Sequence, residues 1–205
     1  MKIVKNLNED SWKTFVENNP NGNIFHTPEM MEVFRRAKGF KPKLWAVVGD
    51  TGDIQAVFMP VQNTVINHFL FRWLTTRAVL FGSVLCAPTP EGNEALDYVL
   101  SRYNRRMGRS ILFTELRNLS DMSNLQPILK KNGLEYEEHL NFLVDLKKSK
   151  KEIWNNIRSN AQRNIRKSDK SGVTIEAVTE QSGILEAYTV LQQVYSRIQF
   201  PLPDQ

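Results

Sequence analysis

The sequence contains few of the residues that metal sites and thiol enzymes need. Its single cysteine, Cys86, excludes an internal disulfide. Cys86 lies in the apolar run VLFGSVLCAP without a basic neighbour, so we expect a buried, unreactive thiol. The three histidines, His26, His68 and His139, lie far apart with no carboxylate or thiol at ligand spacing. The sequence therefore predicts no metal site, and it supports no Ser-His-Asp or Cys-His catalytic arrangement.

Long hydrophobic runs are also absent. No stretch of about 18 apolar residues occurs, so we expect no transmembrane helix. The first residues, MKIVKNLNEDSW, lack the apolar centre and the small-residue cleavage site of a signal peptide. These two absences predict a cytoplasmic protein.

The positive charge is concentrated in one segment. The chain has a net charge of +5. Residues 147–170 hold nine cations against two carboxylates, a net of +7, which leaves −2 for the rest of the chain. A protein that coats DNA without specificity usually spreads its charge more widely, so we expect no DNA partner and a local anion-binding role for this segment.

The hydrophobic pattern predicts alternating helices and strands. Apolar residues recur at helical spacing in four segments, namely 8–18, 28–38, 91–107 and 121–132. Strand signals occur in six, namely 44–48, 54–66, 69–74, 78–85, 110–116 and 134–146. The run 78–85 is apolar enough for one continuous central strand. This order predicts an α/β (α+β) domain with a mixed sheet flanked by helices.

The basic segment reads as one long helix. Ser149 and Glu152 match a capping box at its start, and Gly172 supplies a left-handed stop. Apolar residues recur along one side at Ile153, Trp154, Ile157, Ala161 and Ile165. The opposite side carries a cationic stripe at spacing i, i+3, i+4, i+7, consisting of Arg163, Arg166, Lys167 and Lys170.

The stripe has two interpretations. One is the solvated face of an amphipathic helix, which is the usual role of a charge run. The other is a phosphate-binding surface for a diphosphate or an RNA backbone. Two features favour the second: the stripe lacks interleaved acids, and arginine suits bidentate phosphate contacts.

Two stretches of the sequence resemble the FemAB family of peptidoglycan bridge-forming aminoacyltransferases. They are D-L-x-x-S-x-x-E-x-W at 145–154 and R-x-x-I-R-K-x-x-K-x-G-V at 163–173, with a weaker likeness at F-x-T-P-E. The resemblance implies two acyltransferase domains of the GNAT type in tandem, which pass an amino acid from aminoacyl-tRNA to an amine of a phosphorylated cell-wall precursor. It implies no cofactor, and membrane contact only peripherally through a lipid-linked substrate.

The resemblance also implies domain boundaries and site residues. The first GNAT-like domain would occupy 1–145, and 146–205 would hold the basic helix and the opening portion of a second, incomplete domain. A diphosphate would bind at Arg163 or Arg166. A family lysine of the early block aligns with Phe34, so its role would pass to the adjacent Arg35 and Arg36. The catalytic residues stay unassigned.

Two alternative functions remain open. A CoA-dependent GNAT N-acyltransferase would bind pyrophosphate at a Q/R-x-x-G-x-G/A loop at a helix N-terminus, and the nearest match is the run 105–110, RRMGRS. It has Ser110 where Gly or Ala belongs, and Gly108 also suits a helix end. The second alternative is a non-catalytic module that binds a phosphorylated ligand.

Two further features of the sequence have a structural and a functional interpretation. Glu115 and Arg117 either form an ordinary ion pair or line a cleft. Trp73 is expected in the core with Arg72 and Arg77 at the surface, the alternative being that all three contact a ligand.

Overall fold

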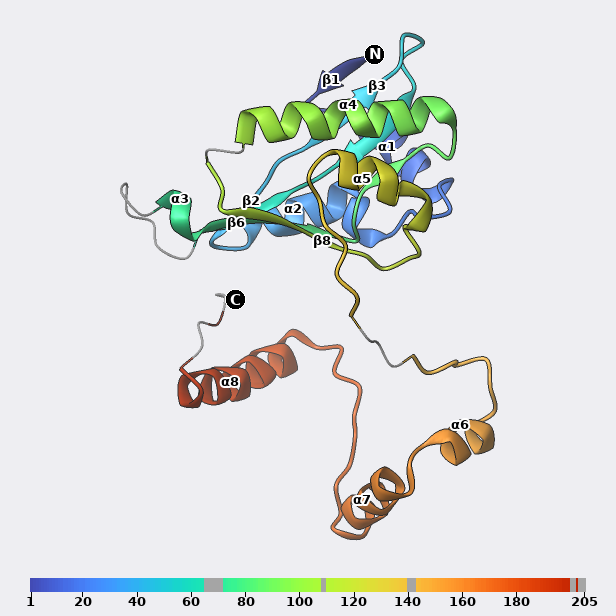
Figure 1. Cartoon of the computed structure of the whole chain (residues 1–205). Coiled ribbons are helices and arrows are strands. Elements are labelled where there is room, and N and C mark those ends of the chain that lie inside the picture. The colour runs from blue at the N-terminus through green and yellow to red at the C-terminus, as the bar shows by residue number, and fades with distance from the viewer. Residues whose placement is uncertain (65–71, 108–109, 140–142, 200–201, 203–205) are drawn as a thin grey trace. The chain divides into compact units, whose positions relative to one another are not determined.

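The computed structural model describes residues 1–64, 72–107, 110–139, 143–199 and 202, and the chain divides into two compact units. Unit 1 covers 1–136 and unit 2 covers 137–202. Figure 1 shows the elements of both units in chain order. The predicted domain boundary between residues 145 and 146 stays a prediction, because a compact unit need not coincide with a domain.

The strands of unit 1 form two four-stranded sheets that share the larger hydrophobic core. They are β1 (Lys2–Val4), β2 (Phe40–Pro42), β3 (Trp45–Val48), β4 (Ile54–Phe58), β5 (Val61–Thr64), β6 (Thr76–Phe81), β7 (Leu85–Cys86) and β8 (Phe113–Arg117). One sheet has the order β1-β3-β4-β7 and the other β2-β5-β6-β8. The β6–β8 pair is parallel, and the other described pairs are antiparallel.

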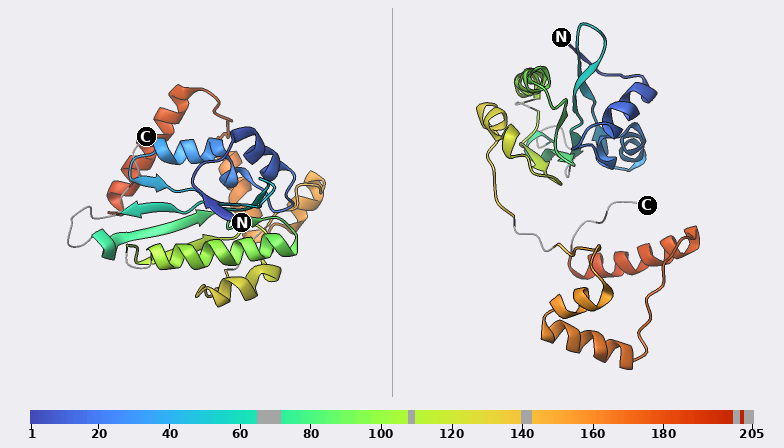
Figure 2. Two further views of the ribbon diagram at one scale, coloured as in Figure 1. Left: turned by 90° about the horizontal axis from the view of Figure 1, so that it is seen from above. Right: turned by 90° about the vertical axis from the view of Figure 1, so that its right-hand side faces the viewer.

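Helices lie on both faces of these sheets (Figure 2). They are α1 (Glu9–Glu17), the 3-10 helix η1 (Ile24–His26), α2 (Pro28–Arg36), α3 (Arg72–Thr75), α4 (Pro90–Met107), the 3-10 helix η2 (Ser123–Leu125) and α5 (Gln126–Lys131). α1 and α2 cover one face, and α4 and α5 cover the other. The predicted mixed α/β architecture is confirmed.

Two hydrophobic cores hold the layers together. The larger core joins α4 and α5 to the sheets around Phe58, Leu96 and Tyr103. Tyr103 meets Phe58 edge to face, with ring centroids 4.8 Å apart. The smaller core packs Trp12 and Val16 of α1 against the other face. Each large apolar side chain buried this way contributes about 1.5–3 kcal/mol, so these contacts fix the positions of the strands.

Local signals in the sequence explain the confirmed helices of unit 1. Asn8 caps α1 by accepting from the Ser11 N–H at 3.0 Å, and Thr27 caps α2 by accepting from the Met30 N–H at 3.2 Å. α4 begins one residue before its predicted start and ends where expected. Gly133 adopts φ of +77° directly after α5.

Four strand predictions need correction. The run 54–66 forms two strands, β4 and β5, which belong to different sheets, and 65–66 lie outside the described residues. The run 78–85 is not one strand, because the chain turns at Gly82 and Ser83 between β6 and β7. The segment 134–146 forms no strand in its described residues, 134–139 and 143–146, and 140–142 lie outside the described residues. In the run 69–74, the first three residues lie outside the described residues, and 72–74 begin α3.

Unit 2 consists of three helices joined by extended segments. They are α6 (Lys150–Asn156), α7 (Ser159–Lys170) and α8 (Gln181–Arg197). The predicted single helix over 149–172 is wrong: Ile157 and Arg158 have extended backbone, with ψ of 132° and 140°, and separate α6 from α7. The capping box at Ser149 and the left-handed Gly172 are confirmed. No described side chain of this unit is buried.

Among the residues that the structure describes, no helix combines the length and the apolar character needed to cross a membrane.

Candidate functional site

Two parallel strands separate at their carboxyl ends in unit 1. β6 and β8 pair in register from Arg77 opposite Phe113 to Phe81 opposite Arg117. Beyond Phe81 the chain turns away and pairs next, as β7, with β4. In α/β sheets, ligands bind outside the carboxyl ends of the strands where neighbouring strands part. This separation is therefore the candidate reaction centre of unit 1.

A left-handed turn produces the separation, and side chains from residues 19–26 hold it. Gly82 and Ser83 have φ of +78° and +74°. Asn23 Nδ2 donates to the Gly82 carbonyl at 3.3 Å, and Asn19 Nδ2 donates to the Cys86 carbonyl at 2.7 Å. These bonds satisfy backbone carbonyls that leave the sheet ladder at the turn, so the early polar block fixes the path of the strand.

His26 completes this support as a neutral side chain. Its Nδ1 accepts the Asn23 N–H at 3.3 Å, which leaves Nε2 as the protonated nitrogen, 3.4 Å from the Ser83 carbonyl. Burial lowers the pKa of His26, and the two backbone carbonyls beside it only partly oppose that shift. The side chain is 2% exposed, so His26 has a structural role and does not line an open site.

Aromatic rings cover the end of β6 on the α2 side. Phe81 stacks on Phe34 at 5.0 Å and on Phe25 at 5.8 Å between ring centroids. The Arg117 guanidinium lies 5.3 Å from the Phe81 ring, and its Nε donates to Glu115 at 2.8 Å. The ion-pair interpretation of Glu115 and Arg117 is confirmed. Phe34 thus packs within this cluster.

Arg35 and Arg36 share one carboxylate. Arg35 Nη1 lies 2.5 Å and Arg36 Nε 2.8 Å from the two oxygens of Glu32. Hydrogen bonds from Arg36 and Arg35 lower the pKa of Glu32, so it stays charged at neutral pH. One of the two positive charges is therefore balanced, and both side chains are exposed on α2.

The amino end of α4 borders an acidic hollow of about 800 Å³. Its lining comes from α1, the β3–β4 turn and the start of α4, and includes Asp10, Asp53 and Glu91 but neither lysine nor arginine. Thr89 Oγ1 already accepts the Gly92 N–H at 3.1 Å. Helix amino ends attract phosphate through free N–H groups, but three carboxylates repel it here. This helix end does not suit a pyrophosphate.

The loop matched to a CoA-binding pattern lies at the opposite end of α4. Arg105 to Met107 form the last turn of that helix, and Gly108 and Arg109 lie outside the described residues. The carboxyl end of a helix presents carbonyl groups and no free N–H groups, so the described backbone of the loop cannot cradle a CoA pyrophosphate.

The four predicted cations of unit 2 lie on one helix. Arg163, Arg166, Lys167 and Lys170 all belong to α7 and are exposed. Arg163 Nη2 donates to the Asn160 side chain at 2.8 Å, and the Arg166 guanidinium lies 5.4 Å from the Trp154 ring of α6. Within the described part of the chain, none of the four is within ion-pair distance of a carboxylate.

One glutamine joins α6 to α7 and thereby positions the stripe. Gln162 Nε2 donates to the Trp154 carbonyl at 2.7 Å and to the Ile157 carbonyl at 3.0 Å. Both carbonyls lie where the helix breaks, so Gln162 satisfies acceptors that a continuous helix would have used. The role of Gln162 could not be predicted from the sequence, because the apolar spacing continues through the break.

The described residues offer no thiol or metal chemistry. Cys86 is 8% exposed, and burial raises its pKa to about 11, so the thiol stays protonated at neutral pH as expected. No group of three or more potential metal ligands occurs among the residues with defined positions.

Trp73 differs from expectation. The side chain lies on α3 and is 52% exposed, so the prediction of a core tryptophan is wrong. Arg77 is exposed, as predicted, and the side chain of Arg72 lies outside the described part of the structure.

Comparison with known proteins shows distant similarity to solved structures. No family model and no curated protein matches the chain. A probable acetyltransferase is 13% identical, with a TM-score of 0.48 over 73% of this chain and 100% of its own. A transcriptional regulator from Bacillus halodurans C-125 is 11% identical, with a TM-score of 0.43 over 70% of this chain and 99% of its own. A Trypanosoma brucei acetyltransferase is 16% identical, with a TM-score of 0.40 over 71% and 99%. Similarity this distant carries no weight for the activity.

Proposed function

We propose that the chain belongs to an acyltransferase that moves an aminoacyl group from aminoacyl-tRNA to an amine of a phosphorylated cell-wall precursor. The observation that carries the proposal is the set of four α7 cations without a carboxylate partner among the described residues. The resemblance to the FemAB family adds the reaction type. In this reading unit 1 contributes the GNAT-like sheet and α7 contributes a phosphate-binding surface.

The spacing of the α7 cations suits a diphosphate better than a single carboxylate. Residues three and four apart on a helix have Cβ atoms roughly 5–6 Å apart, so neighbouring cations can contact successive phosphate groups. Arg163 and Arg166 can each donate two parallel N–H bonds to one phosphate. Stacking of Arg166 on Trp154 limits the freedom of its side chain and reduces the entropy lost on binding.

The reaction needs positioning more than an activated nucleophile from the protein. An amine acceptor attacks the ester carbonyl of the donor, the tRNA hydroxyl leaves, and a base takes one proton from the amine. Holding both substrates together can supply much of the rate. The separated ends of β6 and β8 are where we place the reacting groups, and the general base stays unassigned.

A CoA-dependent N-acyltransferase is the runner-up. The acidic hollow at the amino end of α4 weighs against it, because CoA pyrophosphate would meet Glu91 and Asp53 there. Saturable binding of acetyl-CoA at neutral pH would reverse this ranking.

The test is titration calorimetry with a UDP-linked muropeptide. Arg163→Ala combined with Arg166→Ala should weaken binding by about tenfold or more, since each charged hydrogen bond contributes about 1.5–3 kcal/mol. Lys147→Ala combined with Lys148→Ala removes the same charge outside α7 and should change affinity by no more than about twofold at moderate salt. Equal weakening of binding by both double variants would mean that the stripe is only a solvated face. Binding without any transfer activity would favour the binding-module alternative.

A further inference from the structure

One end of unit 1 carries exposed apolar side chains that the proposed reaction does not use. Trp73 and Leu74 of α3 are 52% and 42% exposed, and Leu112 and Phe113 at the start of β8 are 54% and 47% exposed. The Leu112 N–H donates to the Thr76 carbonyl at 2.8 Å, which joins the two segments. We call these four residues the apolar tip.

Cations lie on the segments next to the apolar tip. Arg77 pairs in register with Phe113, and Arg102, Arg105 and Arg106 lie in the last turns of α4. The Tyr103 hydroxyl lies 3.2 Å from the Thr114 hydroxyl, which places these turns beside the start of β8. Figures 1 and 2 show α3 and the carboxyl end of α4 at the same end of unit 1.

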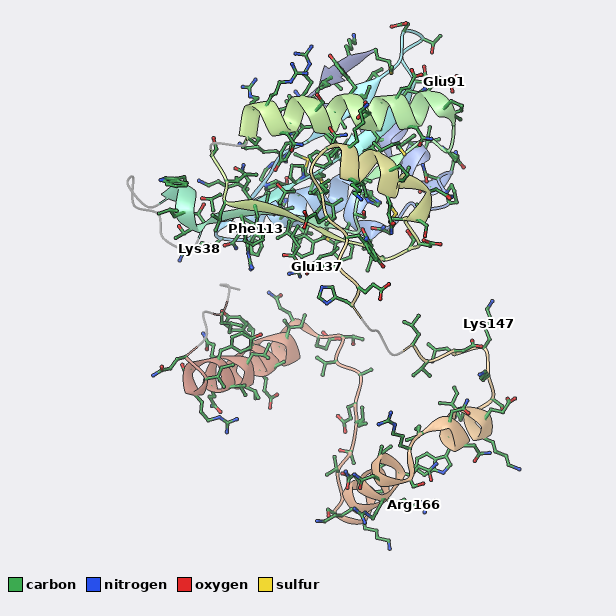
Figure 3. The ribbon with its side chains drawn as sticks, in the orientation of Figure 1. Lys38, Glu91, Phe113, Glu137, Lys147 and Arg166 are labelled. Atoms are coloured by element: carbon green, nitrogen blue, oxygen red, sulfur yellow. The ribbon has the colours of Figure 1, made fainter. Side chains whose placement is uncertain are left out.

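The start of β2 adds further cations to the same end. The register runs across the sheet from Phe40 through Asn63 and Arg77 to Phe113. Lys38 and Lys41 lie on either side of Phe40 in the chain, and Figure 3 shows Lys38 at the same end of unit 1 as Phe113.

Carboxylates are missing from the described segments that build this end. Residues 37–43, 72–81 and 98–107 contain eight lysines and arginines and not one aspartate or glutamate. Among the described residues, no ion pair joins Arg77, Arg102 or Arg106 to a carboxylate. Burial, together with the nearness of Arg106 and Lys43, lowers the pKa of Lys5 to about 8, which agrees with a crowded group of cations here.

We propose that the apolar tip and its cations dock on the surface of a bilayer that contains anionic phospholipids. Exposed Trp, Leu and Phe side chains insert at the level of the lipid headgroups, and a cationic rim adds attraction to anionic lipid. Single-stranded RNA is a weaker fit, because two of the four apolar side chains are leucines, which have no ring to stack on a base. This docking is independent of the proposed phosphate site on α7.

Flotation of the whole chain with ligand-free vesicles tests the docking. The chain should bind vesicles in which about a third of the lipid is phosphatidylglycerol, and bind phosphatidylcholine vesicles at least about tenfold less, because several cations each add attraction to anionic lipid. Added salt should weaken the binding. A chain that stays with neither vesicle, or that binds an RNA oligonucleotide in preference to anionic vesicles, overturns the proposal.

Paired variants assign the binding to this surface. Trp73→Ser with Leu112→Ser should weaken partitioning by about tenfold, since it removes two of the four inserting side chains. Leu119→Ser with Ile24→Ser removes apolar side chains that are 62% and 61% exposed elsewhere on unit 1, and should leave partitioning unchanged.

The charge test follows the same design. Arg105→Gln with Arg106→Gln should weaken partitioning about tenfold, whereas Lys2→Gln with Lys130→Gln should have a much smaller effect. Equal loss in the test and control pairs assigns the binding to general charge or to unit 2 and overturns the proposal. The tryptophan fluorescence of the unmutated chain should shift to shorter wavelength on binding, and Trp73→Phe should remove the shift. A shift that persists in Trp73→Phe also overturns it.

Discussion

Among single residues, His26 shows how a buried polar side chain shapes the candidate site without lining it. It bonds the Asn23 N–H on one side and the Ser83 carbonyl on the other, and its own carbonyl accepts the Trp12 Nε1–H at 2.7 Å. One residue thus connects α1, η1 and the turn that separates the two parallel strands. A histidine of this kind supports the site by fixing the backbone around it.

Replacing His26 should lower the stability of unit 1 and change its dependence on pH. His26→Gln leaves at least one buried backbone group without its partner, so we expect a loss of about 1–3 kcal/mol in the free energy of unfolding. In the native chain the pKa of His26 lies below its ordinary value of 6.5. The unfolded state therefore binds a proton first as the pH falls, and stability should decline below about pH 6.5.

Urea unfolding measured between about pH 7.5 and about pH 5 tests both effects, because histidine titrates within roughly this range. The variant should lose the part of the decline that belongs to His26. His139→Gln is the matched control, because the His139 side chain is 82% exposed. A pH profile that is the same in the native chain and in His26→Gln would show that the residue does not titrate with unfolding.

At the level of elements, the decisive feature is the turn at Gly82 and Ser83. It transfers the chain from one sheet to the other and opens the carboxyl ends of β6 and β8. A Cβ atom on Gly82 would lie 2.4 Å from Asn23 Oδ1. Both the backbone conformation and the close packing therefore require glycine at this position.

Gly82→Ala should destabilise unit 1 by more than backbone strain alone. The left-handed conformation costs an alanine roughly 1–2 kcal/mol, and displacement of Asn23 adds the loss of its bonds to the turn. Gly39→Ala provides the control: Gly39 has φ of +84°, and nothing lies within 4 Å of an added Cβ. Urea titrations should give a larger loss for Gly82→Ala, and equal losses would mean that Asn23 moves aside without cost.

The same turn shows why some elements could be predicted from the sequence and others could not. Caps such as Asn8 and Thr27 act within one helical turn, so the sequence around them is sufficient. The end of a strand depends on its neighbours: 78–85 is apolar apart from Gly82 and Ser83, yet its two halves pair with different strands. The run 134–146 has apolar strand character, but strand formation also requires a partner edge, which no local pattern specifies.

The break between α6 and α7 had a partial signal. Two asparagines precede Ile157, and asparagine favours helix ends over helix interiors. The apolar spacing nevertheless continued across the break and favoured one helix. The four α7 cations could be predicted together because all of them lie after it.

In the whole molecule, a net charge conceals opposite local charges. The sum of −2 outside residues 147–170 combines an acidic hollow at the amino end of α4 with a carboxylate-free end at its other terminus. The sequence located the basic segment of unit 2, because its cations are consecutive. It could not locate the basic end of unit 1, because that end is assembled from three distant segments.

The buried residues predict which part of the chain folds alone. Every described hydrophobic residue in the buried set lies between Trp12 and Leu129, and no described side chain of unit 2 is buried. A fragment covering 1–136 therefore keeps both cores and every described sheet pair. We expect it to unfold cooperatively, with a Tm within a few degrees of the main transition of the whole chain.

A shorter fragment makes this prediction sharper. Residues 1–107 end after α4 and lack β8, together with the buried side chains of Ile111, Met122 and Leu129. Loss of several core side chains at about 2–5 kcal/mol each exceeds the stability of an ordinary domain, so this fragment should not fold. Circular dichroism and calorimetry on both fragments decide the matter. An unfolded 1–136 fragment would mean that unit 1 depends on residues beyond Tyr136, whereas a folded 1–107 fragment would mean that β8 and α5 are dispensable for the core.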